Sequence, residues 1–215
     1  MPDLVPLGDR AWLARFPREA DARRWAQAAR SARRAGVRDV VLAYRSASIH
    51  FDPDAAEGIE DWLRSLTPAD EAESPGRIVV LPVLYDGADL AEIASATGLA
   101  VEEVVALHSR TTYDVFAIGF QPGFPYAGYL PVPLDRLPRR SEPRVRVPAG
   151  SVAIAAWQTG VYPTELPGGW NLLGRTPLSI VDIAAGRFPI RAGDRLKFEP
   201  IDAAEFAARL GEPLR

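Results

Sequence analysis

Between Thr111 and Ile201 the chain is a series of brief apolar runs separated by turns of glycine, proline and asparagine. This punctuation leaves little room for long helices, and short strands at close spacing are typical of all-β architectures. Most of the prolines of the chain fall in this stretch, where they stiffen turns. The pattern therefore predicts a closed or curled β-structure in the C-terminal part of the chain.

The remaining segments predict a mixture of strands and helices. Before residue 67 we expect a strand at 8–16, an amphipathic helix at 19–35, two short strands within 37–52 and a helix at 55–66, which together make a small α/β domain. In the C-terminal part, we expect a strand at 77–85 and short helices at 89–97, 100–109 and 203–210.

Residues 67–76 read Thr-Pro-Ala-Asp-Glu-Ala-Glu-Ser-Pro-Gly and have no apolar periodicity. Two prolines in a polar stretch are typical of an exposed linker. We therefore predict an α+β protein of two domains, an α/β domain with its linker at residues 1–76 and a β-rich domain at residues 77–215.

Composition excludes several classes of function. The chain has 215 residues, 47% of them hydrophobic, and a net charge of -3, so no strong field favours nucleic acid or an anionic membrane. It contains no cysteine, which excludes disulfides and thiolate sites. It shows neither a secretory signal pattern nor an apolar run of membrane-spanning length. We expect a cytoplasmic protein whose partners include neither nucleic acid nor a membrane.

Three stretches concentrate glycine, proline and aromatic residues. They span residues 119–126, 144–152 and 158–177. Glycine lets the backbone approach a ligand, proline stiffens the turn, and aromatic rings supply flat apolar walls, so these stretches predict the rim of a preorganised pocket. The same residues also build ordinary β-turns, which is the alternative.

In this order, the three stretches resemble the KipI family, also called the allophanate hydrolase subunit one family. The specific part of the resemblance runs from His108 to Pro177. It is closest to the branch that holds the B subunits of 5-oxoprolinases, of the carboxyltransferase subdomain C and D type. The resemblance implies a small N-terminal α/β domain followed by a cyclophilin-like β-barrel. One departure is Trp157 before Gln158-Thr159-Gly160, where the family has small residues; its indole could narrow the pocket or cover a subunit contact.

The resemblance also implies an activity. It implies a subunit of an ATP-dependent 5-oxoprolinase that is inactive alone and activates 5-oxoproline for hydrolysis to glutamate. The implied partners are a homologous-type barrel subunit and a third, hydrolytic subunit. The chain has no Gly-x-x-x-x-Gly-Lys-Ser/Thr loop and no Gly-x-Ser-x-Gly elbow. We therefore expect ATP to bind with or through a partner subunit.

Two other functions are compatible with the same resemblance. One is a carboxyltransferase-type half site that receives carboxylated biotin from another protein. The other is a non-enzymatic inhibitor of a sporulation histidine kinase. Charge and composition do not discriminate among these two functions and the 5-oxoprolinase subunit.

His108 is the predicted catalytic residue. Only His50 and His108 carry an imidazole, and His108 belongs to the family motif, which implies that it assists proton transfer. A histidine at this place can equally interact with the carboxyl end of a helix. Because the histidines are far apart in sequence and no acidic residue lies at ligand spacing, we expect no metal site.

The predicted substrate-binding residues fall into three kinds. Arg146 and Arg175 suit the substrate carboxylate, because a guanidinium binds it bidentately, although an ion pair with a neighbouring glutamate is the alternative. Gln158 and Thr159 suit the lactam amide, or else they stabilise turns. The aromatic residues are predicted pocket walls, with a core role as the alternative; they are Phe120, Phe124, Tyr126 and Tyr162.

Overall fold

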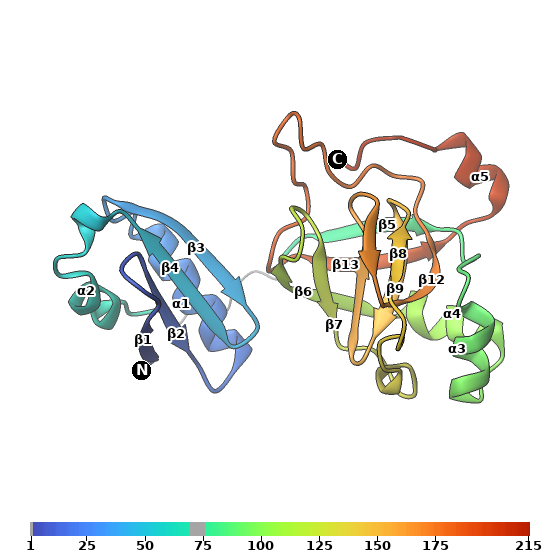
Figure 1. Cartoon of the computed structure of the whole chain (residues 1–215), viewed down its shortest axis with the longest axis horizontal. Helices are drawn as coiled ribbons and strands as arrows, with labels where there is room; N and C mark the ends of the chain where they lie inside the picture. The colour runs from blue at the N-terminus through green and yellow to red at the C-terminus, as the bar shows by residue number, and fades with distance from the viewer. Residues whose placement is uncertain (1, 69–75) are drawn as a thin grey trace. The chain divides into compact units, whose positions relative to one another are not determined.

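The computed structural model describes residues 2–68 and 76–215, and the chain divides into two compact units, Met1–Pro75 and Gly76–Arg215. Each unit has a sheet of its own (Figure 1). The predicted linker at 67–76 lies mostly outside the described residues. Among the helices that the structure describes, none is long and apolar enough to cross a membrane.

The N-terminal unit is an antiparallel sheet of order β1-β2-β4-β3. The predicted strand at 8–16 is instead a hairpin of two strands, because Gly8, with φ of 68°, turns the chain between them. The elements are β1 (Asp3–Pro6), β2 (Ala11–Arg15), α1 (Glu19–Ser31), β3 (Val37–Ala43), β4 (Ser46–Phe51), the 3-10 turn η1 (Pro53–Ala55) and α2 (Ile59–Ser65).

Helix α1 packs on one face of this sheet because its apolar residues recur at helical spacing. Trp25 is 1% exposed, and the alanines at positions 22, 26 and 29 let the helix approach the strands closely. Ile49 and Leu42 of the sheet are buried beneath it. The arginines of α1 lie outside this apolar stripe; Arg30 is exposed, and Arg23 and Arg24 are partly buried.

The C-terminal unit contains a seven-stranded sheet of order β12-β9-β10-β7-β6-β13-β5, which curls into a nearly closed barrel (Figure 1). Only the β13–β5 pair is parallel. The predicted closed β-structure is thereby confirmed. The elements are β5 (Ile78–Val83), α3 (Leu90–Thr97), α4 (Val101–Arg110), β6 (Thr112–Ile118), β7 (Pro125–Gly128), the 3-10 turn η2 (Leu134–Arg136), β8 (Arg144–Val147), β9 (Ser151–Ala155), β10 (Gln158–Val161), β11 (Leu166–Gly168), β12 (Asn171–Arg175), β13 (Arg195–Pro200) and α5 (Ala203–Ala208).

The barrel closes where the end of β5 meets the end of β12. Leu84 and Arg175 exchange two backbone hydrogen bonds, each of 2.9 Å. A side chain at Gly174 would collide with the backbone of Leu84, and one at Gly87 would collide with β12. Closure therefore depends on two glycines that let the strands approach.

Large apolar side chains fill the barrel, and helix α4 covers one end. Leu81, Val115, Ile154 and Phe198 have 0% exposure and belong to one continuous core. His108 of α4 packs into this core. The interior is therefore packed solid, and ligands must bind outside it.

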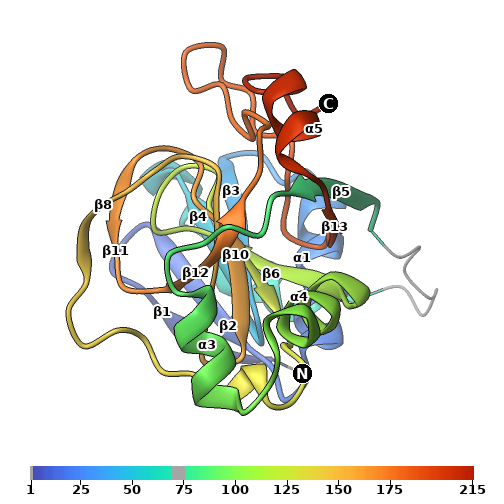
Figure 2. The same cartoon turned by 90° about the vertical axis from the view of Figure 1, so that its right-hand side faces the viewer.

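A two-stranded ribbon of β8 and β11 lies beside the barrel (Figure 2). It covers a second apolar cluster whose largest members are Phe124, Tyr162 and Trp170. These rings meet edge to face, with centroids 5.3 Å apart for Phe124–Tyr162 and 5.5 Å for Phe124–Trp170. The ribbon is thus anchored by aromatic packing.

Candidate functional site

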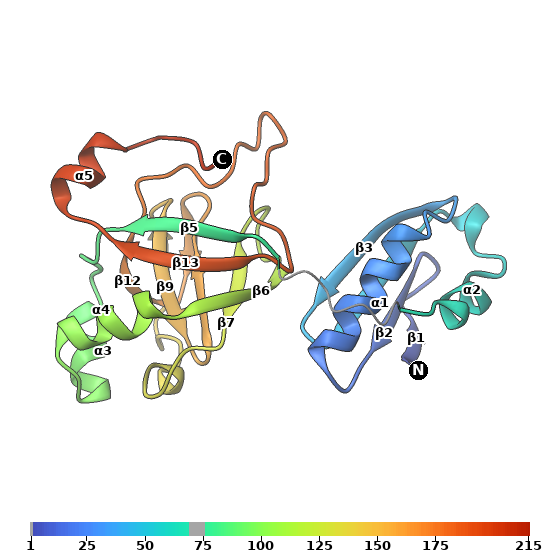
Figure 3. The same ribbon diagram turned by 180° about the vertical axis from the view of Figure 1, so that it is seen from behind.

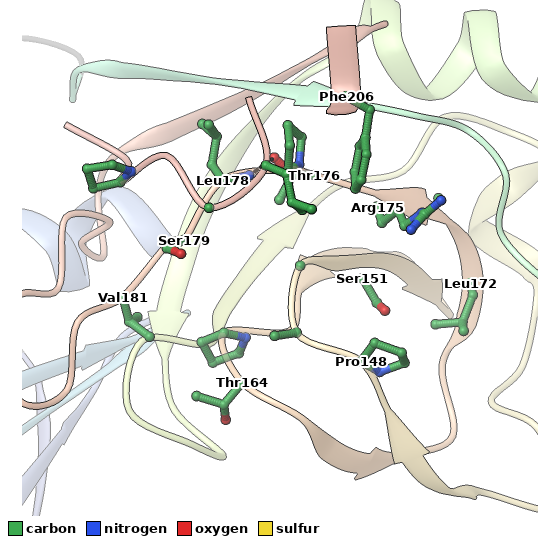
Figure 4. Close-up of a pocket in the computed structure, with 18 of the residues that line it drawn as sticks. Pro148, Ser151, Thr164, Leu172, Arg175, Thr176, Leu178, Ser179, Val181 and Phe206 are labelled. Atoms are coloured by element: carbon green, nitrogen blue, oxygen red, sulfur yellow. Dashed lines mark hydrogen bonds between the residues drawn. The ribbon is translucent and has the colours of Figure 1, made fainter. Parts of the chain in front are cut away.

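The C-terminal unit has a cavity of about 1110 Å³, which we call the Arg175 cavity (Figure 4). The second and third sequence motifs supply nearly half of its lining residues, and the first motif, 119–126, supplies none. It is lined by residues 86–88, 148–151, 163–164, 174–179 and 181–183, together with Leu172, Arg187, Phe206, Leu210, Gly211 and Pro213. Two of the three motifs therefore meet at this cavity.

Arg175, the last residue of β12, is held in this cavity by two contacts. Its Nε lies 3.0 Å and its Nη2 lies 2.8 Å from Oδ2 of Asp86. On the other side, the Phe206 ring lies with its centroid 4.4 Å from the guanidinium carbon, a cation–π contact. The side chain is still 50% exposed, and in the part of the chain that the structure describes its Nη1 has no hydrogen-bond partner. Arg175 is therefore oriented and free to donate to a ligand.

Three hydroxyl groups line the same cavity from three segments. They belong to Ser151 at the start of β9, Thr164 before β11 and Ser179 after β12 (Figure 4). None of these hydroxyls has a hydrogen bond to another described residue. The cavity thus combines a carboxylate, a guanidinium and free hydroxyls, which can bind a small polar ligand by both its donors and its acceptors.

His108 lies elsewhere, in the barrel core with 0% exposure. Its Nδ1 is 2.8 Å from the Tyr85 hydroxyl and its Nε2 is 2.9 Å from Oγ1 of Thr159. Burial lowers the pKa of His108 to about 3, so the ring is neutral at pH 7. Since both nitrogens are bound and no atom reaches the surface, the geometry supports a structural role in place of the predicted proton transfer.

The predicted lactam-binding pair is not brought to the cavity. Thr159 is 0% exposed, and its hydroxyl donates to the carbonyl of Ala153 at 3.2 Å while it contacts His108. Gln158, at the start of β10, is partly exposed and does not line the cavity. The adjacent Trp157 packs on Tyr129, with ring centroids 4.9 Å apart, so its indole does not narrow the cavity.

Arg146 and the predicted aromatic walls also lie apart from the Arg175 cavity. The Arg146 side chain is 78% exposed and lies 3.5 Å from Glu165, the ion pair that was the alternative. Phe124 and Tyr162 are each 2% exposed and belong to the cluster under the ribbon, with Tyr126 packed against it. Phe120 is 57% exposed and contacts Phe124 edge to face at 5.7 Å. Phe124, Tyr126 and Tyr162 therefore act mainly as core, whereas Phe120 lies at the surface.

Asp89 fixes the second motif beside the cavity. Its side chain is 3% exposed and accepts hydrogen bonds from Arg144 at 2.6 and 2.9 Å, from Arg140 at 2.8 Å and from the Leu172 backbone at 2.7 Å. Burial alone would raise the pKa of Asp89, but the bonds from Arg144 and Leu172 outweigh it and hold the pKa below its ordinary value. The carboxylate thus joins β8, β12 and the start of α3.

Among the residues that the structure describes, no three histidine, cysteine, aspartate or glutamate side chains gather as a metal site would require. This finding agrees with the chemistry of the cavity, whose only acidic side chains are Asp86 and Asp182. Asp86 is occupied by Arg175, and Asp182 accepts from the Ala185 backbone at 3.0 Å.

Comparison with protein families identifies the family of this chain. The family model of the carboxyltransferase domain, subdomain C and D, matches residues 2–188. The chain belongs to this family. The match covers nearly all of the N-terminal unit and the C-terminal unit as far as residue 188.

Two curated relatives of this carboxyltransferase-family chain are named as the B subunit of 5-oxoprolinase. The protein of Escherichia coli O157:H7 is 47% identical over 151 residues, which are 68% of this chain and 67% of that protein. The protein of Haemophilus influenzae is 34% identical over 209 residues, 91% of this chain and 96% of that protein. The second alignment extends over nearly the whole of both chains.

A solved structure supports the same fold assignment. The crystal structure of TTHA0988 superimposes with a TM-score of 0.80 at 39% identity. The match covers 90% of this chain but 40% of the TTHA0988 chain. This carboxyltransferase-family chain therefore spans less than half of that longer polypeptide.

Arg175 is the one lining residue of this cavity that was predicted from the sequence as a site residue; Asp86, Ser151 and Phe206 are among those that were not. Asp86 follows the end of a predicted strand, a position that often carries polar site residues, so its place was a usable signal. Ser151 lies inside the second motif. Phe206 belongs to a tail helix distant in sequence from Arg175, and no local pattern connects the two.

Proposed function

We propose that this chain is a subunit of an ATP-dependent 5-oxoprolinase and binds 5-oxoproline in the Arg175 cavity for hydrolysis to glutamate. The names of the curated relatives and the chemistry of the cavity support this function. In the overall reaction, water adds to the lactam carbonyl carbon, the bond between that carbon and nitrogen breaks, and the nitrogen gains a proton to give glutamate.

The Asp86–Arg175 pair is the observation that carries the proposal. In 5-oxoproline the carboxylate is bonded to the carbon next to the ring nitrogen, so the carboxylate and the ring N–H lie side by side. Arg175 can donate to the carboxylate through Nη1, and Asp86, beside it, can accept from the ring N–H. The hydroxyls of Ser151, Thr164 and Ser179 supply donors for the lactam oxygen. Two opposite charges side by side therefore match two adjacent groups of the substrate.

The size of the cavity supports the need for a partner subunit. Its volume of about 1110 Å³ exceeds the roughly 300–1,000 Å³ typical of pockets that enclose a drug-sized ligand. A molecule as small as 5-oxoproline leaves most of this space to water, which weakens polar contacts. We propose that a homologous-type barrel subunit covers the cavity and excludes water, with a third subunit completing the hydrolytic complex.

The described residues do not fit a nucleotide. The sequence has no phosphate-binding glycine loop, and its single lysine, Lys197, donates to the Arg110 carbonyl at 2.8 Å outside the Arg175 cavity. Phosphates need clustered backbone N–H donors or free cations. We therefore assign to this chain the binding and orientation of 5-oxoproline, and place ATP on a partner subunit.

The test is glutamate formation from 5-oxoproline by the reconstituted complex. Omitting this chain should abolish turnover, and Arg175→Ala should raise KM for 5-oxoproline by about 10–100-fold, as for loss of a charge-assisted contact. Arg38→Ala is the matched control, because Arg38 forms a similar bidentate pair with Asp52 on the surface of the N-terminal unit. Full turnover without this chain, or an unchanged KM in Arg175→Ala, would refute the proposal.

A carboxyltransferase half site is the second candidate, and the name of the matching family favours it. In that case the Arg175 cavity would receive carboxylated biotin. Decarboxylation of carboxybiotin by the complex in the absence of 5-oxoproline would support this alternative.

A further inference from the structure

Asp86 lies in a segment without regular secondary structure, between the end of β5 and the start of α3. Before it, Leu84 exchanges two backbone hydrogen bonds with Arg175 of β12. After it, the Gly87 N–H donates to the Leu173 carbonyl at 3.1 Å. Figure 3 shows the segment leaving β5 and passing β12 on its way to α3. The direction in which Asp86 points therefore depends on how the chain is held between these two anchors.

Tyr85 is the residue between the first anchor and Asp86. Its backbone passes close over β12, since a β-carbon on Gly174 would lie 2.8 Å from the Tyr85 Cα. Among the described residues, neither its N–H nor its carbonyl has a hydrogen-bond partner. Its ring packs against the barrel core, and its hydroxyl lies 2.8 Å from Nδ1 of His108. The side chain of Tyr85, and not its backbone, therefore holds this residue in place.

His108 is a rigid anchor for the Tyr85 hydroxyl. The imidazole has 0% exposure, and its ring centroid lies 4.5 Å from that of Phe198. Its Nε2 lies 2.9 Å from the Thr159 hydroxyl, which itself donates to the Ala153 carbonyl. The Thr159 hydroxyl therefore accepts from Nε2–H, and the Tyr85 hydroxyl donates to Nδ1. Rotation of the tyrosine would leave Nδ1 unpaired inside the core, which is unfavourable.

A tight turn carries this attachment from the core to the Arg175 cavity. The Asp86 N–H donates to the Leu84 carbonyl at 3.1 Å, so the turn is centred on Tyr85. Tyr85 packs against the core, whereas Asp86 lines the cavity and contacts Nη2 of Arg175 at 2.8 Å. Charge-assisted hydrogen bonds need short distances of about 2.7–2.9 Å. A small rotation of the turn therefore weakens the pair of Asp86 and Arg175.

We infer that His108 and Tyr85 are positioning residues for the Arg175 cavity. His108 holds the Tyr85 hydroxyl. Tyr85 in turn fixes the turn that directs Asp86 at Arg175. The inference rests on the proposed function, in which this pair binds 5-oxoproline. Since neither positioning residue touches the substrate, loss of the Tyr85 hydroxyl weakens substrate binding and leaves the chemical step unchanged.

The test compares two substitutions of buried tyrosines. Tyr85→Phe keeps the packed ring and removes the hydroxyl that binds the imidazole of His108. Tyr113→Phe is the matched control, because it also removes a core hydroxyl that bonds to His108. That hydroxyl donates to the backbone carbonyl at 2.9 Å, and Tyr113 is not next to a cavity residue in the chain. Circular dichroism verifies that both variants fold.

The first measurement uses the full chain alone and needs no turnover. In the proton–nitrogen NMR spectrum, the Arg175 Nε–H resonance reports the hydrogen bond to Asp86, and its loss in Arg175→Ala identifies it. This resonance should shift in Tyr85→Phe and stay unchanged in Tyr113→Phe. An unchanged resonance in Tyr85→Phe, or the same shift in both variants, would overturn the inference.

The second measurement is the steady-state kinetics of the reconstituted complex. Tyr85→Phe should raise KM for 5-oxoproline by about 3–10-fold with kcat unchanged, and Tyr113→Phe should match wild type. In an Asp86→Ala background, Tyr85→Phe should change KM by less than about 1.5-fold, because it acts through the missing carboxylate. Equal KM in wild type and Tyr85→Phe, or an undiminished effect in the Asp86→Ala background, would also overturn the inference.

The two measurements separate this inference from the proposed function. A wild-type complex that does not hydrolyse 5-oxoproline would refute the proposed function. The NMR comparison of Tyr85→Phe with Tyr113→Phe would then decide the positioning role by itself, because it detects the hydrogen bond between Asp86 and Arg175 directly.

Discussion

His108 and Thr159 are joined inside the barrel by a hydrogen bond of 2.9 Å between Nε2 and Oγ1. The Thr159 hydroxyl already donates to the Ala153 carbonyl, so it accepts from Nε2–H, and Nδ1 accepts from the Tyr85 hydroxyl. This chain of bonds assigns the tautomer of the histidine. These hydrogen bonds also attach helix α4 to strand β10, so the helix cannot shift from the end of the barrel without breaking them.

Replacing His108 should therefore reduce stability. His108→Ala leaves a cavity against Phe198, whose ring centroid lies 4.5 Å away, and leaves the Thr159 and Tyr85 hydroxyls without their partner. We expect a loss of about 3 kcal/mol in the free energy of unfolding, measured by urea denaturation. His50→Ala is the control, because His50 is exposed, and should stay within about 0.5 kcal/mol of wild type. A stable His108→Ala protein that loses turnover in the complex would instead indicate catalysis.

The stability of the protein should depend on pH through the same residue. The pKa of His108 is about 3 in the folded state, against about 6.5 in the unfolded chain. Between these values only the unfolded chain takes up the proton. The contribution of the neutral histidine is therefore complete above about pH 6.5 and falls by up to about 1.4 kcal/mol per pH unit as the pH drops toward 3.

The comparison that isolates this effect is His108→Gln, which cannot titrate. The difference in unfolding free energy between wild type and His108→Gln should shrink as the pH is lowered from 7 to about 4.5, because only the wild type loses this contribution. A constant difference would mean that His108 is not held neutral by burial.

Much of the fold follows from local pattern. The apolar runs between Gly, Pro and Asn turns predicted the barrel strands, and the helical spacing at 89–97 and 100–109 matches α3 and α4 closely. The hairpin of β1 and β2 was missed, because the extended residues on both sides of Gly8 look like one strand unless the glycine is assigned a positive φ.

The candidate site was harder to predict from the sequence than the fold. Arg175 was identified because a motif arginine suits a carboxylate, yet the same argument selected Arg146, which is exposed at the ribbon. Strand alternation alone does not reveal which side of a ribbon faces a cavity. The partners Asp86 and Phe206 come from distant segments that meet Arg175 only after the barrel closes.

Asp89→Asn should loosen the attachment of the second motif. The neutral amide keeps the shape of the side chain but cannot neutralise Arg140 and Arg144, whose side chains are 28% and 25% exposed. We expect a loss of about 3 kcal/mol in the free energy of unfolding, at the lower end of the cost of breaking a buried ion pair, because the arginines retain some water. The measurement is urea denaturation at pH 7.

The control for this substitution is Asp54→Asn, since Asp54 is an exposed residue of η1. It should change the unfolding free energy by less than about 0.5 kcal/mol. If Asp89→Asn also left the unfolding free energy unchanged, an uncharged amide would replace the Asp89 carboxylate fully. The assigned role of the carboxylate in joining β8 to β12 would then be wrong.

Phe206 should stabilise the position of Arg175 through its ring. A double-mutant cycle of Phe206→Leu and Arg175→Gln should give a coupling of about 0.5–1 kcal/mol in the free energy of unfolding, the range for a partly exposed cation–π pair. Leucine keeps apolar bulk against the barrel while removing the π-face. The same cycle with Arg136→Gln, a residue of η2 that does not line the cavity, should be additive within about 0.5 kcal/mol. Additivity in the Arg175 cycle as well would mean that Asp86 alone orients the guanidinium and that helix α5 contributes only bulk to the cavity wall.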